Sequence, residues 1–116
     1  MVQPGVVLVT ASSQAEANAI ATALVKEQLA ACVSIAPIQS VYCWQGDLHQ
    51  DAEWQLTIKT DLSQFSALAA RVQQLHSYEV PEVIALPIEA GTTAYLEWLT
   101  NQVKAVGSAE TSGEQA

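Results

Sequence analysis

Hydrophobic and polar residues alternate along residues 40–60, on both sides of the pair Gly46-Asp47. A period of two is typical of β-strands, because successive side chains point to opposite faces of a sheet. Glycine tolerates a positive φ and aspartate can bond to neighbouring backbone, so Gly46-Asp47 is the expected turn of one long β-hairpin. The rest of so short a chain cannot cover this hairpin. We therefore expect open strand edges and an obligate oligomer in which hairpin strands pair between copies.

Shorter apolar patterns organise the rest of the chain. Largely apolar runs predict strands, and apolar residues spaced three or four apart predict helices. The expected strands cover residues 6–11, 32–35 and 83–88, and the expected helices begin at Ser13, Asp61 and Gly91. The element order is therefore βαββαβ followed by a C-terminal helix. It predicts an α+β fold with an antiparallel sheet and helices on one face.

Local signals refine these boundaries. Ser13 and Glu16 have the spacing of a capping box, in which each side chain bonds a free amide of the first helical turn. Pro37 has no amide hydrogen, so we expect Ala36-Pro37 to bend or bulge the strand that starts at Cys32 and to place that strand at an edge of the sheet. The largely apolar run 6–11 is expected in the middle of the sheet.

One domain is expected over residues 1–106. The chain has 116 residues, which is enough to bury a single hydrophobic core. From Gly107 onward no apolar residue is larger than alanine, so this segment cannot offset the entropy lost on ordering. Residues 107–116 are therefore predicted to form a disordered tail.

The composition excludes several classes of partner. Twelve acidic and four basic side chains give a net charge of -8, which repels nucleic acid and anionic membrane surfaces. No apolar run approaches the ~20 residues needed to span a bilayer. No basic residue precedes the first apolar run, as one would in a secretory signal. Cys32 and Cys43 lack CxxC spacing, which fits a reducing compartment. We therefore expect a cytoplasmic protein with no nucleic-acid or membrane partner.

Motifs of the common enzyme classes are missing from the sequence. It contains no GxSxG, P-loop, GxGxxG or HExxH pattern. We therefore expect a non-enzymatic binding protein.

Four short motifs occur in the order and spacing of a known family: Leu29-Ala30-Ala31-Cys32-Val33, Tyr42-Cys43-Trp44-Gln45-Gly46, Ile58-Lys59-Thr60 and His76-Ser77-Tyr78-Glu79-Val80-Pro81-Glu82. From about Val6 to Val103 the chain resembles the CutA divalent-cation tolerance proteins. The resemblance implies a ferredoxin-like fold and a homotrimer built on pairing of the long strands between subunits, related in architecture to the PII signalling proteins. It also implies a role in divalent-cation tolerance or homeostasis, with Cu(II) as the first metal to consider.

The same resemblance implies a metal site near His76. Copper-binding members of the family carry a cysteine and two histidines as ligands, and this chain has Val9, Leu75 and His76 at those positions. Imidazole nitrogen and carboxylate oxygen both bind divalent metals, so the predicted metal ligands are His76, Glu79 and Glu82. The alternative is that His76 only completes the end of a helix and that the two glutamates are solvated loop residues.

Asp47, His49 and Asp51 alternate at the expected tip of the hairpin, where three potential ligands would project to one side. An exposed turn carries the same polar residues, and this is the favoured interpretation.

A second group of residues, Tyr42, Trp44, Lys59 and Tyr78, predicts a site for a small anionic ligand. Tyr42 and Trp44 share one face of the hairpin, and aromatic rings with one basic group suit such a ligand. A cleft between subunits built from these residues would resemble the effector sites of PII-like trimers. The protein would then carry or sense a metabolite and have no metal role. The alternative is that Tyr42 and Trp44 pack in an interface between subunits.

Overall fold

The computed structural model describes residues 2–105 and contains four strands, three α-helices and one 3-10 turn. In chain order these are β1 Pro4–Ala11, α1 Gln14–Lys26, β2 Cys32–Trp44, β3 Asp47–Asp61, η1 Leu62–Gln64, α2 Phe65–Leu75, β4 Val83–Pro87 and α3 Thr93–Gln102. The strands form one antiparallel sheet in the order β2-β3-β1-β4. This confirms the predicted α+β class and order of elements. The predicted tail, residues 107–116, lies outside the described residues.

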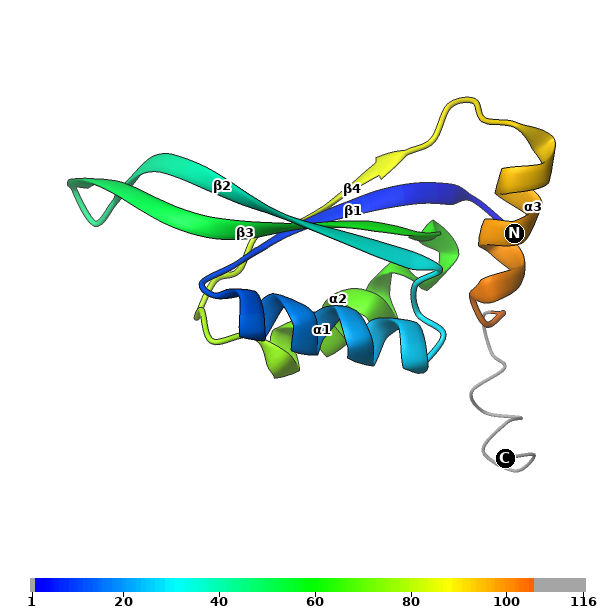
Figure 1. Cartoon of the computed structure of the whole chain (residues 1–116), viewed down its shortest axis with the longest axis horizontal. Helices are drawn as coiled ribbons and strands as arrows, with labels where there is room; N and C mark the ends of the chain where they lie inside the picture. The colour runs from blue at the N-terminus through cyan, green and yellow to red at the C-terminus, as the bar shows by residue number, and fades with distance from the viewer. Residues whose placement is uncertain (1, 106–116) are drawn as a thin grey trace.

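The core lies between the sheet and two of the helices. Helices α1 and α2 lie on one side of the sheet, and α3 stands at its end beside the N-terminal strand (Figure 1). Val7 and Val9 of β1 are completely buried and pair with Ile58 and Leu56 of β3, which are buried as well. The helices complete this core with Ala17, Ile20, Leu24, Leu68 and Val72. Strand β1 pairs with β3 on one side and β4 on the other, which confirms its predicted central position.

The hairpin turn consists of Gln45 and Gly46. Both residues have positive φ, 53° and 85°, the backbone of a two-residue turn whose twist matches that of the flanking strands. Asp47 already belongs to β3 and pairs with Trp44. The predicted turn Gly46-Asp47 is therefore wrong by one residue. Gly46 in the sequence indicated the position of the turn, but not whether the second turn residue is Gln45 or Asp47.

Pro37 does not interrupt β2. The strand continues through it, and Pro37 pairs with Trp54 of β3. The register is regular on both sides of Pro37, so the predicted bulge is absent. The predicted edge position is confirmed, because β2 is an outer strand of the sheet. Proline has no N–H to donate, and on an edge strand its nitrogen can face away from the neighbouring strand, so no hydrogen bond of the sheet is lost.

The hairpin is longer than the strand beside it. Strand β1 has 8 residues, whereas β3 has 15. Strand β1 pairs with residues 54–61 of β3, so residues 47–53 pair only with β2 within the described part of the chain. This end of the hairpin projects past the helices and the rest of the sheet (Figure 1). The rest of the chain therefore leaves much of the hairpin uncovered, as expected.

The helix starts agree with the predicted capping residues, with one difference. The Oγ atom of Ser13 accepts the N–H of Glu16 at 3.1 Å. The carboxylate of Glu16 bonds the N–H of Ser12 at 3.0 Å, one residue before the amide that a capping box uses. Asp61 caps the 3-10 turn that leads into α2, so this helix begins at Phe65.

Replacement of Gly5 should show how closely β1 packs against η1. A Cβ atom on Gly5 would overlap the side chain of Leu62. Gly5→Ala should therefore lower the free energy of unfolding by about 1–3 kcal/mol, the usual range for overpacking, as measured by urea denaturation. In the double variant Gly5→Ala/Leu62→Ala the overlapping atoms are gone, so its loss should be smaller than the sum of the two single losses. Additive losses would contradict the predicted clash.

Candidate functional site

A cavity of about 650 Å³ lies between the projecting part of the hairpin and the α2–β4 loop, residues 76–82. This volume is in the range of sites for small molecules. The residues that line the cavity come from the end of β1, from both strands of the hairpin and from the loop. They are Thr10, Ser40, Val41, Tyr42, Trp44, Glu53, Tyr78, Glu79, Val80 and Glu82.

His76 holds the α2–β4 loop against the end of β1. Its side chain is completely buried, although part of its backbone is exposed. Its Nε2 atom lies 2.6 Å from the carbonyl oxygen of Thr10, and its Nδ1 atom accepts the backbone N–H of Tyr78 at 3.0 Å. A carbonyl oxygen can only accept, so the hydrogen must be on Nε2. Both ring nitrogens are therefore engaged within the protein.

Glu16 joins the start of α1 to the same loop. Its carboxylate accepts the N–H of Ser12 at 3.0 Å, the hydroxyl of Ser12 at 2.9 Å and the N–H of Ser77 at 2.6 Å. Its Oε2 atom also lies 3.6 Å from Nδ1 of His76. Partial burial by itself raises the pKa of Glu16, but the hydrogen bonds from Ser12 and Ser77 outweigh it and lower the pKa from 4.5 to about 2. The ionised carboxylate is therefore the form that stabilises this junction.

Tyr78 connects the loop to β3. Its hydroxyl donates to Oε2 of Glu53 at 2.6 Å, and its ring centroid lies 4.8 Å from that of His76. Burial raises the pKa of Tyr78 far above its usual value of 10.0, and the hydrogen bond to the Glu53 carboxylate raises it further. The phenol therefore remains neutral and keeps donating to Glu53.

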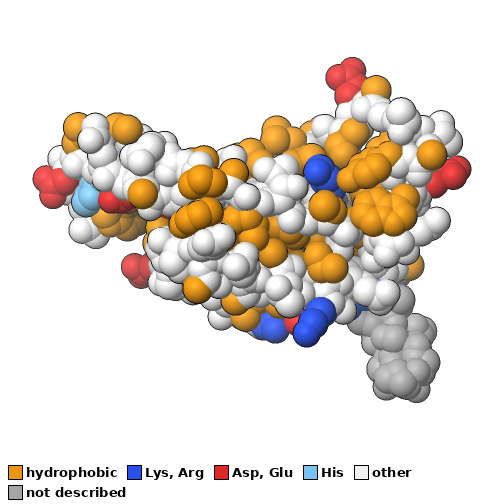
Figure 2. Space-filling model, viewed as in Figure 1, with side chains coloured by type: hydrophobic (Ala, Val, Ile, Leu, Met, Phe, Trp, Pro, Cys, Tyr) orange, Lys and Arg blue, Asp and Glu red, His pale blue; other side chains and the backbone are white. Residues whose placement is uncertain are grey.

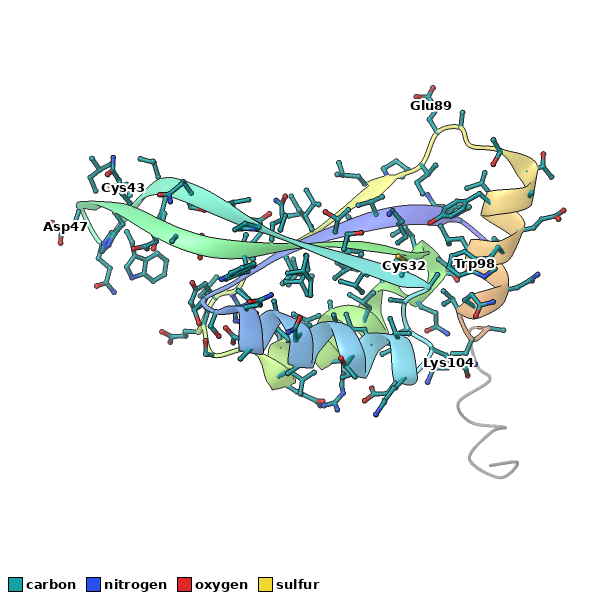
Figure 3. All side chains as sticks on the ribbon, viewed as in Figure 1. Cys32, Cys43, Asp47, Glu89, Trp98 and Lys104 are labelled. Carbon is teal, nitrogen blue, oxygen red and sulfur yellow. The ribbon has the colours of Figure 1, made fainter. Side chains whose placement is uncertain are left out.

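Tyr42 makes a similar contact across the hairpin. Its hydroxyl donates to Asp51, and its ring stacks on that of His49 with 5.4 Å between the centroids. The hydrogen bond to Asp51 raises the pKa of Tyr42, so this phenol is neutral too. Of the three alternating residues at the hairpin tip, Asp51 and His49 thus both contact Tyr42. Asp47 lies at the end of the hairpin (Figure 3).

Three of the four residues predicted for the anionic cleft line the cavity. These are Tyr42, Trp44 and Tyr78. Lys59 is not among the lining residues, because it pairs with Cys32 at the other end of the hairpin. The register of the hairpin separates Lys59 from the aromatic residues. The part of the cavity that one chain forms therefore lacks the basic group on which the prediction of an anionic ligand depended.

The predicted metal ligands do not form one group. Glu79 and Glu82 line the cavity, whereas His76 does not. Between residues 2 and 105, no three His, Cys, Asp or Glu side chains are grouped so that they could hold a metal ion. A single chain therefore contains no preformed site made of His76, Glu79 and Glu82. The physical reason is that the imidazole of His76 is buried and that both of its nitrogens already form hydrogen bonds, so neither nitrogen is free to bind a metal.

Sequence reasoning missed Thr10, Glu16 and Glu53 as members of this region. For two of these residues, the sequence contained a feature that could have indicated their role. Thr10 is a polar residue in an otherwise apolar strand, and its carbonyl receives the histidine. Glu16 stood in the capping-box pattern, but its contact with Ser77 joins residues 61 positions apart. Glu53 looked like one more polar residue of an alternating strand, yet it is only 6% exposed.

The fold and the cavity define a small α+β protein with an open four-stranded antiparallel sheet, a projecting hairpin and a ligand-sized cavity beside it. Residues 5–102 match the family described as CutA1 divalent ion tolerance protein. The chain belongs to this family.

Individual relatives agree with this assignment. The divalent-cation tolerance protein CutA of Thermus thermophilus is 50% identical over 95 residues, which cover 81% of this chain and 92% of that protein. Protein CutA 1, chloroplastic, of Oryza sativa subsp. japonica is 48% identical over 100 residues, which cover 85% of this chain but 56% of the rice protein.

Solved structures of relatives have the same fold. The Cut A1 protein of Thermus thermophilus superposes with a TM-score of 0.85 at 47% identity, covering 87% of this chain and 99% of that chain. The periplasmic divalent cation tolerance protein CutA of Archaeoglobus fulgidus gives a TM-score of 0.85 at 36% identity, with the same coverage of 87% and 99%.

Glu16→Gln should make stability less dependent on acid pH. The pKa of Glu16 falls from 4.5 to about 2 on folding, so its stabilising effect is complete above pH 4.5 and is lost as the pH falls to about 2. At about pH 6 the wild type should exceed the variant in free energy of unfolding by on the order of 2 kcal/mol. Urea unfolding at several pH values measures this difference, which should shrink as the pH falls.

The matched control for this experiment is Glu89→Gln, which removes the charge of an exposed carboxylate in the loop before α3. This control should show no comparable pH-dependent difference from the wild type. A loss in Glu16→Gln that stays the same from neutral to acid pH would contradict the role of the ionised carboxylate.

Proposed function

We propose that this protein serves divalent-cation tolerance as a non-enzymatic homotrimer. Membership of the CutA1 family supports the tolerance role. The names of its relatives in Thermus thermophilus and Pectobacterium atrosepticum describe tolerance and no reaction. The observation that carries the trimer is the projecting hairpin with its open edges.

Two open edges support assembly through the sheet. Strand β2 is the outer strand along all 13 of its residues, and residues 47–53 of β3 have β2 as their only strand partner in the described chain. Unpaired N–H and C=O groups at such edges readily bond with another strand. Pairing between the hairpins of neighbouring copies satisfies these groups. Closed rotational symmetry then limits the assembly to a fixed number of subunits.

The face of the sheet opposite α1 and α2 supports the same proposal. Ile84 and Leu86 of β4 are 49% and 47% exposed. Tyr95 and Trp98 of α3 are also exposed, and their ring centroids lie 5.5 Å apart. Figure 2 shows hydrophobic side chains gathered over the strands and around α3 on the face in view. Exposed apolar surface of this kind marks a protein interface, and another copy of the chain is the proposed partner.

The strand order supports a ferredoxin-like topology. The described chain contains two successive strand-helix-strand units, β1-α1-β2 and β3-α2-β4, and the order β2-β3-β1-β4 places the first strand of each unit in the middle of the sheet. Helix α3 is an addition after the second unit. This is the arrangement of the split βαβ pattern.

Cu(II) is the first divalent cation to test, although one chain does not provide the expected ligand set. The imidazole of His76 is buried, and its two nitrogens are engaged with Thr10 and Tyr78. A net charge of -8 concentrates cations near the protein without specifying a site. We therefore propose that copper, where it binds, is held by groups other than His76.

A cytoplasmic location without nucleic-acid or membrane partners is also proposed. Cys32 and Cys43 are free, as is common in reducing compartments. None of the described helices has the length and apolar character needed to cross a bilayer. The relatives are not uniform in this respect, because the rice protein is named chloroplastic and the Archaeoglobus fulgidus protein periplasmic.

The cavity favours a second candidate function, the carriage or sensing of a small molecule. Its volume of about 650 Å³ and its three aromatic side chains are typical of ligand sites. The cavity lies along the part of the hairpin at which copies would join. A trimer would then hold each ligand near a boundary between subunits.

Light scattering should give about three times the 12.4 kDa mass of one chain at micromolar concentration. Val41 is 62% exposed on β2, and a lysine there should weaken edge-to-edge pairing, so Val41→Lys should shift the protein toward smaller species. The matched control is Val25→Lys on α1, where valine is 42% exposed and away from the hairpin; it should remain assembled. A monomeric wild-type protein would contradict the trimer.

Copper affinity should not depend on the imidazole of His76. Calorimetric titration of chelator-treated protein with Cu(II) should give the same affinity for the wild type and for His76→Gln, whose amide can still donate to the carbonyl of Thr10. The chain has two histidines, so the matched control is His49→Gln. A loss of more than about tenfold in His76→Gln alone, worth about 1.4 kcal/mol, would reinstate His76 as a ligand.

A further inference from the structure

The cavity beside the hairpin is acidic. Its lining includes the carboxylates of Glu53, Glu79 and Glu82 and no basic side chain. Asp51 adds a fourth carboxylate next to it, hydrogen-bonded to Tyr42 of the lining. An anion in this cavity would meet repulsion from several charges with no partner, whereas a cation would be attracted.

Glu53 is the most buried of these carboxylates, and only one of its two oxygens accepts a hydrogen bond within the described chain. The residue is 6% exposed, and its Oε2 atom accepts the hydroxyl of Tyr78 at 2.6 Å. Its Oε1 atom has no hydrogen-bond donor in the described chain. Every fully buried side-chain nitrogen or oxygen of the described residues has a hydrogen-bond partner. Because Oε1 has none, it is not fully buried and can be reached from the cavity. Because Glu53 lines the cavity, this free oxygen is available to a donor bound there.

Aromatic side chains form the other part of the lining. Tyr42, Trp44 and Tyr78 come from β2 and from the α2–β4 loop. The two tyrosine hydroxyls donate to Asp51 and Glu53, so their oxygens add further negative potential to the cavity. Aromatic faces attract organic cations through their quadrupole, and they also bury the apolar groups that such cations carry.

A bare metal ion does not suit this arrangement. The carboxylates are distributed around a cavity of about 650 Å³, and no three of the described His, Cys, Asp or Glu side chains converge on one point. A molecule that carries a positive charge on an apolar frame can use one carboxylate and the aromatic rings together.

We propose that this cavity binds an organic ammonium ion, whose positive nitrogen lies near Oε1 of Glu53 and whose apolar groups contact Tyr42, Trp44 and Tyr78. The inference rests on the small-molecule function given above as the second candidate. It reverses the charge of the ligand expected from the sequence, because the part of the lining that one chain supplies includes Glu53 and excludes Lys59.

Three probes of similar shape test the sign of the charge. The assembled full-length protein is titrated by calorimetry at low salt with benzylammonium, with neutral benzyl alcohol and with anionic benzoate. Benzylammonium should bind saturably and at least about tenfold more tightly than either of the others, a difference of about 1.4 kcal/mol. Added salt should weaken its binding.

Variants place the binding in the cavity. Glu53→Gln removes the charge but keeps an oxygen that can accept from Tyr78, and it should weaken benzylammonium binding at least about fivefold. Glu89→Gln removes one charge from the loop before α3, far from the hairpin end where Asp47 lies, and should leave the affinity unchanged (Figure 3). Trp44→Leu keeps an apolar side chain at an exposed position and removes the ring, so it should weaken binding without affecting the fold.

Each other outcome overturns a defined part of the proposal. Preferential binding of benzoate, lost in Trp44→Leu, would keep the small-molecule function and reject the ammonium ion. Equal weakening by Glu53→Gln and Glu89→Gln would show attraction to the overall charge and would reject the cavity as the site. Absence of binding by all three probes would reject both the inference and the small-molecule function, and would leave the divalent-cation role to the copper titration.

Discussion

The difference in length between the hairpin and the central strand governs this structure. Strand β1 ends at Ala11, opposite Trp54, so seven residues of β3 continue beyond it with β2 as their only strand partner in the described chain. A two-stranded ribbon is only marginally stable by itself in water. It must gain contacts from another part of the chain or from another copy. The α2–β4 loop packs against one part of the ribbon, and in the proposed trimer neighbouring copies cover the rest.

The contact between the loop and the ribbon depends on polar side chains at one junction. His76 bonds the carbonyl of Thr10, Glu16 bonds the amide of Ser77, and Tyr78 bonds Glu53. Each bond joins segments far apart in the chain, so together they close the end of the core and set the wall of the cavity. Removing one partner of a buried hydrogen bond leaves the other unsatisfied at a cost of about 1–3 kcal/mol. This explains how a histidine in a family known for cation tolerance can be a structural residue.

Positive charge is common to both functional proposals. The family name refers to divalent cations, and the cavity of this chain is lined by carboxylates and aromatic rings without a basic side chain. The two proposals differ in how the charge is recognised. A metal ion needs several ligands converging on one point, which the described chain does not provide. An organic cation needs a carboxylate and an apolar surface, and the cavity has both.

Local patterns in the sequence were sufficient for the elements and their order. Period-two alternation located the hairpin, Ser13 and Asp61 marked helix starts, and the aromatic residues Tyr42 and Trp44 were placed together because they share a strand face. These properties depend on residues close in the chain. The tertiary structure decided which distant residues meet. The packing of the loop on β1 buried His76 between partners at positions 10 and 78, and it brought Tyr78 to Glu53 of β3. Such contacts follow from the joint packing of β1, β3 and the helices, which no local pattern encodes.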